Sequence, residues 1–508
     1  MIFTVEDIDL FASISHDYNP LHCNYAYAHR TPYGERVVHG ILGVLVCLGR
    51  LVENNNDISL SQLKVKFWKP LFCDVPYSIS LHKINESSVK IMLLDGEAKL
   101  LEIWVAFPEK PGIVNKPVSQ LPNDIFINKS NDINMKDIKA GQLFEGDYGI
   151  KQDEMLLLLR KNNLCGSSLE YISVILLWSS YFIGMIMPGQ QALYAGLNFE
   201  IDRFCTGSNM SLKYSVKTQK FDARFNLLDM EFNCFHFDGN KMAHGNLSAF
   251  VRPKINYNRP AISSTLIQDS EKLSGKTALI TGASRGLGSM LARFLAAMSC
   301  HVIVNFQNSH KEAINLQKCI IDTGGSAEIW QGDIADIDWL NSKKEELLSK
   351  DRVIDILVCN ACQPPKELLF EQNTVLRILA YINKNLEMTC VPLSIFAPML
   401  DNNYGYGIII SSEVVTNPIA LWPHYTGLKT AIEGLISSIA IKYNKTHWFI
   451  VRPPKLLTDM TNSPVSNRDA ADPFLIAKYI CERIFINAIT DVFKSVEIIT
   501  SDKLLDNE

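Results

Sequence analysis

Three residues in the last third of the chain have the types and spacing that proton transfer to a carbonyl oxygen requires. Lys429 follows Tyr425 by four residues on a helical pattern, and because such a pair shares one helix face, the ammonium group lies beside the phenol. A free tyrosine, with a pKa of about 10, is a poor acid or base at neutral pH, and a nearby positive charge lowers that value. Tyr425 can then pass a proton to an alkoxide, while Ser412, just past a buried strand, holds the carbonyl oxygen.

A second set of candidate residues lies near the start of the chain, in the stretch HDYNPLHCN. Asn19-Pro20 forces a turn, so Asp17 and His22 sit on a loop and can converge on one point. A carboxylate and an imidazole that converge on a water can add it to, or remove it from, a C=C bond. Gly40, which opens an apolar helix, can offer its amide and the helix dipole to a developing oxyanion. Spacing alone leaves a structural alternative open, in which Asp17 caps a helix and His22 is a loop histidine with its hydrogen bonds satisfied.

A glycine turn marks a third candidate site, in the stretch TALITGASRGLGS from Thr277 to Ser289. A short apolar strand breaks there, and Gly282, Gly286 and Gly288 lead into a helical pattern. Glycines at these points let backbone amides approach a pyrophosphate, and the helix N-terminus that follows favours the anion. A glycine-rich turn can also be purely structural, so the turn alone does not assign a function.

Length, composition and charge narrow the class of protein. At 508 residues the chain is long enough for about three domains, and its 47% apolar and 20% charged residues are typical of a globular protein. The net charge of −5 and the absence of a lysine or arginine block favour small substrates over nucleic acid. The acidic N-terminus argues against a signal peptide, and twelve scattered cysteines suggest reduced thiols, so we expect a cytoplasmic protein. The Cys359-x-x-Cys362 pair ends an apolar strand, which disfavours redox or metal chemistry, and no metal site is predicted.

The order of helical and strand patterns predicts the domains. Residues 1–108 contain a long apolar helix followed by a meander of short strands, as expected for an α+β sheet wrapped around one helix, and residues 143–255 repeat this order. Residues 109–142 and 256–273 have the composition of linkers. In residues 274–508 helices alternate with strands at the spacing of an α/β doubly wound parallel sheet. The uncharged stretch from Tyr171 to Met187 is marginal in length for a membrane span, and we expect a buried helix there.

The first block resembles the MaoC-like hot-dog family of (R)-specific enoyl thioester hydratases and dehydratases. The resemblance spans roughly the first 105 residues and rests on SISHDYNPLHCNYAYAHRTPYGERVVHGILG, which contains the D-x-N-P-x-H pattern. It implies a hot-dog fold in which Asp17 and His22 are catalytic. His16 stands where the family often has glycine. Residues 143–255 lack the pattern, and we expect them to complete a double hot dog and to shape the acyl pocket.

The last block resembles the short-chain dehydrogenase/reductase family, especially its 3-oxoacyl thioester reductases. The resemblance covers about 230 residues and implies a Rossmann-type fold in which Ser412, Tyr425, Lys429 and Asn385 are catalytic. The cofactor-binding residues that it implies are Gly282, Ser284, Arg285, Gly286, Leu287, Gly288, Asn305, Asp333, Ile334, Asn360, Ala361, Tyr425, Lys429 and Thr458. Cys359, Cys362 and Pro454 depart from the family pattern.

The two resemblances together imply a bifunctional enzyme. We expect reduction of a 3-oxoacyl thioester to the (R)-3-hydroxyacyl thioester, and then dehydration to the trans-2-enoyl thioester. Asn305 in place of an acidic residue, together with Arg285, predicts NADP(H) as the cofactor. The substrate carrier is either coenzyme A or an acyl carrier protein, and the protein is expected to form a homodimer. Two alternatives remain open: the degradative direction, as hydratase and dehydrogenase, and a hot-dog half that only binds substrate or dimerises.

Overall fold

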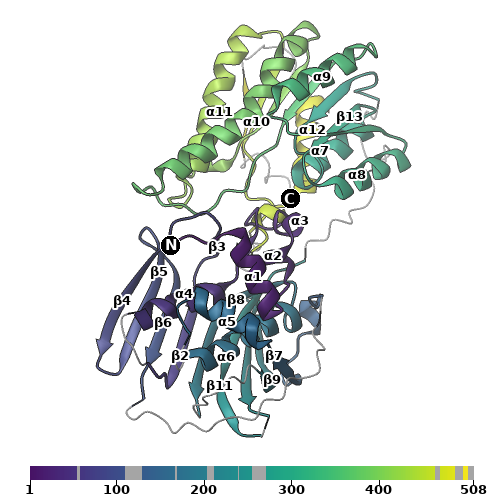
Figure 1. The fold of residues 1–508 in the computed structure, drawn as a ribbon. Coiled ribbons are helices and arrows are strands. Elements are labelled where there is room, and N and C mark those ends of the chain that lie inside the picture. Colours follow the sequence, from purple (N-terminus) through teal and green to yellow (C-terminus); the bar gives the residue numbers. More distant parts are fainter. Residues whose placement is uncertain are drawn as a thin grey trace. The chain divides into compact units, whose positions relative to one another are not determined.

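The computed structural model describes residues 1–53, 58–108, 127, 129–165, 169–202, 211–237, 239–254, 262, 271–463, 469–486 and 496–500. The chain divides into two compact units after Lys254, apart from a short segment at Ser463 that groups with the first unit (Figure 1). Most of the predicted linkers, 109–142 and 256–273, lies outside the described residues. The described end of the first linker includes the short helix η1 (Met135–Asp137).

The first unit is built on one nine-stranded antiparallel sheet, to which both residues 1–108 and residues 143–255 contribute. The strand order is β4-β5-β6-β2-β8-β11-β10-β9-β7. The strands are β2 (Gln62–Phe67), β4 (Ser78–Asn85), β5 (Ser88–Asp95), β6 (Ala98–Ala106), β7 (Leu143–Gly149), β8 (Ala192–Ile201), β9 (Ser211–Asp222), β10 (Leu227–Phe235) and β11 (Lys241–Val251). The two blocks that the sequence separates therefore share one sheet.

Strands β2 and β8 join the two halves of this sheet. They pair antiparallel, with Leu63 opposite Phe199 and Val65 opposite Leu197, and all four of these side chains are buried. Because side chains alternate between the faces of a strand, the lysines of β2 point to the opposite, solvent-facing side. The junction is thus a continuous part of the hydrophobic core.

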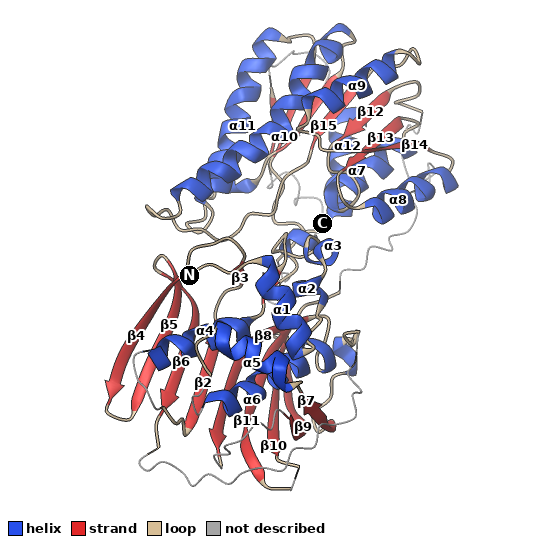
Figure 2. Cartoon of the chain, viewed as in Figure 1, coloured by secondary structure: helices blue, strands red, loops and turns tan. Residues whose placement is uncertain are grey.

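One long helix from each half covers the buried face of the sheet (Figure 2). Helix α4 (Gly40–Glu53) packs against β4, β5 and β6, helix α6 (Leu169–Tyr181) packs against β9, and the two helices contact each other. Helix α6 continues as a π-helical turn, η2 (Phe182–Ile186). The stretch Leu169–Ile186 is long and apolar enough to cross a membrane, and 89% of it is buried inside the structure. The helix is buried, as the sequence predicts.

Short elements near the N-terminus carry the candidate acid and base. Helix α1 (Val5–Ser15) starts at a capping box formed by Thr4 and Asp7, and ends at His16, whose φ of 59° is left-handed. Glycine adopts this conformation most easily, which explains why a glycine is common at this position in the family that the sequence resembles. Short helices α2 (Pro20–Cys23) and α3 (Tyr25–Ala28) follow, and β1 (Val37–Val38) pairs with β3 (Leu71–Phe72). Helix α5 (Gln152–Lys161) contacts α1.

The second unit is the predicted doubly wound α/β fold. Its seven parallel strands have the order β14-β13-β12-β15-β16-β17-β18. They are β12 (Thr277–Ile280), β13 (His301–Phe306), β14 (Ser326–Gln331), β15 (Ile356–Cys359), β16 (Tyr406–Ile410), β17 (His447–Val451) and β18 (Glu497–Ile499). The strand order reverses between β12 and β15, and ligands of open α/β sheets bind at such a switch point.

Helices cover both faces of the parallel sheet. One core cluster includes residues of α7 (Gly286–Ala297), α8 (His310–Asp322) and α12 (Pro473–Cys481), and the other includes residues of α9 (Ile337–Leu348), α10 (Val375–Asn402) and α11 (Pro423–Lys442). Strand residues alternate between them, so that Ile280 packs in the first cluster and Leu279 in the second. Short turns complete the fold: η4 (Glu413–Val415), η5 (Asp459–Thr461) and η6 (Glu482–Ile486).

Candidate active sites

Asn19 holds the loop between α1 and α2 against the segment from η2 to the start of β8. Its side-chain oxygen accepts a 3.0 Å hydrogen bond from the Leu21 amide and so caps α2. Its side-chain nitrogen donates to the carbonyls of Gly184 and Gly189, each at 3.0 Å. The asparagine of the D-x-N-P-x-H pattern therefore locks the loop in place, and Asp17 and His22 on either side of it take fixed positions.

Asp17 is a buried carboxyl group with two hydrogen-bond donors. The Ser180 hydroxyl donates to Oδ2 at 2.7 Å and the Asn19 amide donates to Oδ1 at 3.2 Å. Burial raises the pKa of Asp17 from its ordinary 3.8 to about 7, because loss of water penalises the charged form more than these two bonds favour it. Asp17 can therefore hold a proton near neutral pH.

His22 is a neutral imidazole whose tautomer is set by its main-chain partner. Nδ1 lies 2.7 Å from the carbonyl oxygen of Val37, which can only accept, so Nδ1 carries the proton and Nε2 is left as the acceptor. Burial lowers the pKa of His22 to about 4, although the bond to Val37 acts in the other direction. His22 therefore offers a basic Nε2 over the range of pH in which Asp17 holds its proton.

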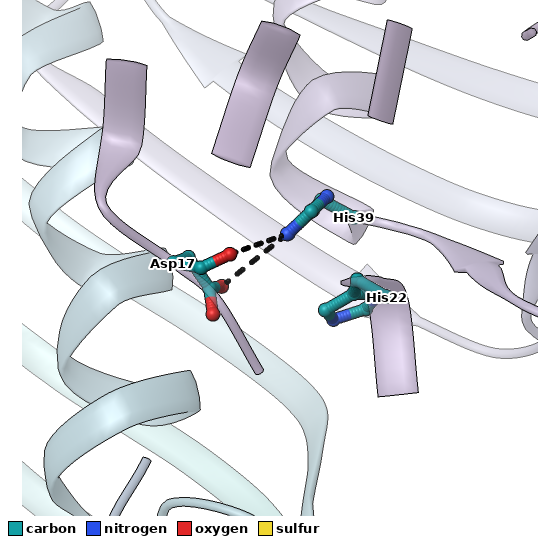
Figure 3. A group of neighbouring side chains, drawn as sticks. All are labelled: Asp17, His22 and His39. Carbon is teal, nitrogen blue, oxygen red and sulfur yellow. Dashed lines mark hydrogen bonds and ion pairs between the residues drawn. The ribbon is translucent and has the colours of Figure 1, made fainter. Parts of the chain in front are cut away.

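His39 lies beside both Asp17 and His22 (Figure 3). Its ring stacks on that of His22 with centroids 3.9 Å apart, and Nε2 lies 3.0 Å from the main-chain oxygen of Asp17. One ligand atom from each of Asp17, His22 and His39 lies within 4.8 Å of the other two, close enough for a metal ion. Because Nδ1 of His22 and Nε2 of His39 are engaged by main-chain oxygens, we assign the cluster to proton transfer, and the absence of a metal stays a prediction.

Asp17 and His22 open onto a cavity of about 170 Å³. Its wall is mostly apolar, and Gly40, the first residue of α4, lies on it. A side chain at Gly40 would meet the Phe67 ring at 2.6 Å, so glycine leaves room for this ring at the start of α4. The predicted acid, base and oxyanion donor therefore share one cavity.

The second half of the sheet contributes residues that the sequence did not single out. Ser180 belongs to α6 and Gly184 to the π-helical turn that continues it. A side chain at Gly184 would lie 2.1 Å from Oδ1 of Asp17, so glycine is required for the carboxyl group to fit. The available signal was the pair Ser179-Ser180 inside an otherwise apolar run, which marks a polar contact within a core helix.

In the second unit the predicted cofactor residues gather at the switch point of the sheet. Gly282 and Gly286 have φ values of +61° and +57°, in the left-handed region, and α7 begins at Gly286. A side chain at Gly288 would meet the Asn360 amide at 2.6 Å. Asn360 in turn donates to the carbonyls of Thr281 and Gly282, and so ties the end of β15 to the glycine turn. These contacts fix the glycine turn against the end of β15.

Other predicted cofactor residues are engaged within the protein. Asn305 is buried, and its side chain bonds the Gly282 amide at 3.4 Å and the carbonyls of Trp330 and Gly332 at 3.3 Å. Arg285 forms a 2.8 Å ion pair with Asp459, beside Thr458. The sequence argument places Arg285 at the 2′-phosphate, but in the structure Arg285 already has a carboxylate partner. Asn305, which stands in place of an acidic residue, supports the sheet.

The remaining predicted cofactor residues also lie near the switch point of the parallel sheet. Asp333 accepts from the Ala335 amide at 3.0 Å and from the Gln307 side chain at 3.1 Å. The Ile334 side chain is buried in the core cluster with Leu340, so any contact of Ile334 with a cofactor would come from its main chain. Ser284 and Leu287 are buried in the glycine turn and the first turn of α7, and Ala361 donates its amide to the Thr281 hydroxyl at 2.9 Å.

Ser412, Tyr425 and Lys429 are close together past the end of β16 and on α11. The Lys429 ammonium donates to the Ile410 carbonyl at 2.8 Å and lies 5.6 Å from the centroid of the Tyr425 ring. Burial raises the pKa of Tyr425, the neighbouring Cys362 thiol acts in the same direction, and a hydrogen bond with Ser412 opposes them. The sequence predicts a lowered pKa for Tyr425, whereas the structure gives a raised one, because desolvation of the phenol dominates.

Asn385 is buried in the middle of α10 and fixes the loop after β15. Its side-chain oxygen accepts from the Gln363 amide at 2.8 Å, and its nitrogen donates to the Tyr381 carbonyl at 2.8 Å. Cys362, one of the departures from the family pattern, lies with its sulfur 3.8 Å from the Tyr381 hydroxyl. Cys359 and Cys362 are both free thiols.

The donor set at the switch point fits a dinucleotide. Left-handed glycines, a helix N-terminus and the absence of a side chain at Gly288 together form a cradle for a pyrophosphate. Tyr425 and Lys429 lie on the same carboxyl side of the strands. Gly282, Gly286 and Gly288 would hold the phosphates, and Asn360 and Thr458 flank them.

Two protein families match the two units. Residues 2–102 match the family described as MaoC like domain, and residues 276–469 match the family described as short chain dehydrogenase. The chain is therefore a fusion of a MaoC-like domain with a short-chain dehydrogenase domain, which confirms both resemblances seen in the sequence. It joins an oxidoreductase domain to a domain of dehydratase type.

Individual proteins are similar to parts of the chain. The hydroxynaphthalene reductase-like protein Arp2 of Metarhizium acridum is 29% identical over 203 residues, which cover 37% of this chain and 71% of that protein. The 3beta-hydroxysteroid dehydrogenase 1 of Eggerthella lenta is 25% identical over 250 residues, 46% of this chain and 89% of that protein. A solved metagenomic short-chain oxidoreductase in complex with NADP is 25% identical, with a TM-score of 0.39, and covers 45% of this chain and 99% of its own.

Proposed function

We propose that the chain reduces a 3-oxoacyl thioester with NADPH to the (R)-3-hydroxyacyl thioester and dehydrates this product to the trans-2-enoyl thioester. The observation that carries the proposal is the buried pair in the first unit. A proton-holding Asp17 and a basic His22 face one mostly apolar cavity with the N-terminal glycine of α4. This arrangement suits the loss or gain of water next to a thioester.

In the dehydration step the groups have complementary tasks. Nε2 of His22 takes the proton from C2 of the hydroxyacyl thioester, and the Asp17 carboxyl group gives its proton to the C3 hydroxyl, which leaves as water. The electrons of the C2–H bond form the C2–C3 double bond. The amide of Gly40 stabilises the negative charge that develops on the thioester oxygen. The pair ends with His22 protonated and Asp17 ionised, and proton exchange between them restores the starting state.

In the reduction step the chain supplies a proton and holds the substrate. The nicotinamide, when bound, supplies the hydride. Ser412 donates a hydrogen bond to the 3-oxo oxygen and Tyr425 protonates the alkoxide, while Lys429 provides positive charge beside the phenol. The related proteins named as a reductase and as a hydroxysteroid dehydrogenase support chemistry at a ketone or alcohol.

The cofactor preference rests on Arg285, whose guanidinium group can bind a phosphate through paired hydrogen bonds. Asn305 puts no carboxylate near the end of β13, and its buried side chain is bonded to the main chain. We therefore keep NADP(H) as the proposed cofactor, with Arg285 exchanging Asp459 for the 2′-phosphate.

The nine-stranded sheet with one covering helix from each half supports a double hot dog. In this arrangement the second half lacks the D-x-N-P-x-H pattern, and Ser180 and Gly184 complete the site of the first half. Asp17 has a raised pKa that a domain used only for binding or dimerisation would not need, which favours catalysis over that alternative. The homodimer, the cytoplasmic location and the absence of nucleic-acid and membrane partners stay predictions.

Separate assays of the two activities test the proposal. Wild type should hydrate a crotonyl thioester, and Asp17→Asn and His22→Ala should each lose about 100-fold or more, the scale of lost acid–base catalysis. Tyr425→Phe should keep this activity and lose NADPH-dependent reduction of a 3-oxobutyryl thioester. Unchanged crotonyl hydration by either Asp17→Asn or His22→Ala would refute the dehydratase assignment.

A further inference from the structure

Lysine and tryptophan side chains gather on the solvent-facing side of β2, β5 and β6. The pairing register places Trp104 between Lys64 on one neighbouring strand and Lys90 on the other. The ammonium groups of Lys64, Lys66 and Lys90 lie 5.6, 5.7 and 5.3 Å from the centroid of the Trp104 ring. We call the lysine–tryptophan patch the set Lys64, Lys66, Trp68, Lys90, Lys99, Glu102 and Trp104.

Trp68 connects this patch to the cavity of the first unit. The residue follows the end of β2 and is 53% exposed. The ammonium groups of Lys66 and Lys99 lie 5.4 and 5.9 Å from its ring centroid. Trp68 and its neighbour Lys69 also line the cavity that holds Asp17 and His22. The patch is thus continuous with the cavity wall.

The patch carries an excess of positive charge. The patch has four ammonium groups and one carboxylate, Glu102. Glu102 forms an ion pair with Lys90 and lies 4.0 Å from the ammonium group of Lys99. It also accepts a 3.2 Å hydrogen bond from the Trp68 indole. Among the described residues Lys64 and Lys66 make no ion pair. Like charges on neighbouring strands destabilise a sheet, so a bound anion would relieve the repulsion.

We propose that the lysine–tryptophan patch binds the phosphorylated adenosine end of coenzyme A, so that the acyl carrier for this site is coenzyme A. The adenine would stack on the exposed face of Trp68 and the phosphates would contact Lys66 and Lys99, with the thioester arm entering the cavity past Lys69. An acidic carrier protein would also suit the lysines, but it gives no reason for an exposed indole among them. This inference rests on the proposed function of the cavity.

Kinetics with two crotonyl thioesters that share a reacting group test the inference. Crotonyl-CoA carries the nucleotide and crotonyl-pantetheine does not. For crotonyl-CoA the KM should rise about fivefold in Lys66→Ala, with kcat unchanged, and about tenfold in Trp68→Ala. Trp68→Phe, which keeps a ring, should restore most of the loss. Lys213→Ala is the matched control. Lys213 lies on β9, a strand of the other half, and its ammonium group is 5.4 Å from the centroid of the Phe237 ring.

The two substrates and a direct binding measurement separate the outcomes. The inference predicts that Lys66→Ala and Lys99→Ala leave the KM for crotonyl-pantetheine unchanged, and that Trp68→Ala raises it much less than the KM for crotonyl-CoA, because Trp68 also lines the cavity. Equal effects on both thioesters, or no effect on either, would overturn it, as would a loss confined to crotonyl groups on an acyl carrier protein. Calorimetry with free coenzyme A should show weaker binding to Trp68→Ala than to wild type or Lys213→Ala. This result would support the patch even if the cavity hydrated no thioester, and binding unchanged by Trp68→Ala would refute it.

Discussion

The hydroxyl of Ser180 donates a 2.7 Å hydrogen bond to the carboxyl group of Asp17, although the two residues are 163 positions apart. Ser180 lies on α6, in the second half of the first unit, and Asp17 lies on the loop after α1, in the first half. The half that lacks the D-x-N-P-x-H pattern therefore contributes to the acid–base site directly.

Removing the Ser180 hydroxyl should move the pH dependence of dehydration. The bond lowers the pKa of Asp17 against the effect of burial, so Ser180→Ala should raise that pKa. A hydrogen bond to a charged group is worth about 1.5–3 kcal/mol, which corresponds to a shift of about one pH unit or more. The alkaline limb of the pH profile of kcat/KM should therefore move to higher pH by that amount. Ser179→Ala is the control, because the Ser179 hydroxyl bonds the Leu176 carbonyl instead, and an unmoved limb in Ser180→Ala would show that the bond is only structural.

The wild-type dehydratase should have a bell-shaped pH profile. In the reactive state the Asp17 carboxyl group carries a proton and Nε2 of His22 does not. A second proton is added as the pH falls through about 4, and the last is lost as the pH rises through about 7. The rate should therefore be level between these values and fall about tenfold per pH unit above 7. A rate that rises through pH 7 to 8 would mean that ionised Asp17 is the base.

The same burial of Asp17 should cost stability at alkaline pH. Since its pKa is raised to about 7 from 3.8, Asp17 favours folding fully below pH 4, and this contribution is lost as the pH rises through 7. The difference between these two pKa values corresponds to a loss of up to about 4 kcal/mol in the free energy of unfolding. Asp17→Asn should thus unfold at a higher Tm than wild type at pH 8, with the gap closing near pH 4. A lower Tm for Asp17→Asn at pH 8 would contradict the raised pKa.

The Arg285–Asp459 ion pair should weaken NADPH binding. Asp459 competes with the 2′-phosphate for the guanidinium group, so Asp459→Asn should lower the Kd for NADPH about fivefold and leave that for NADH unchanged. Arg285→Ala should raise the Kd for NADPH alone. Quenching of protein fluorescence measures both values without turnover. If Arg285→Ala raises the Kd for NADPH and the Kd for NADH equally, Arg285 does not contact the 2′-phosphate.

Much of both folds could be predicted from patterns that are local in the sequence. The strand HVIVNF is β13 to the residue, and the helix from Gly40 starts where the glycine stands, because each pattern reports burial along one element. Asp17 and His22 meet because the Asn19-Pro20 turn is only a few residues long. Such short-range geometry is encoded by neighbouring residues.

Contacts between distant segments could not be predicted in this way. Nothing near Ser180 indicates that its partner is Asp17, and the ion pair of Arg285 with Asp459 joins loops that follow different strands. The direction of the Tyr425 pKa shift also depends on how much water the fold removes, whereas the sequence shows only that Lys429 is near. These features arise from packing, which no single window of sequence reports.

The products formed from one 3-oxobutyryl thioester and NADPH test the coupled function most directly. Wild type should yield the (R)-3-hydroxybutyryl and the crotonyl thioester, Tyr425→Phe neither product, and His22→Ala the hydroxy product alone. If His22→Ala still accumulated the crotonyl thioester, or if wild type made an (S)-hydroxy product that was not dehydrated, the proposed succession of the two reactions would be wrong.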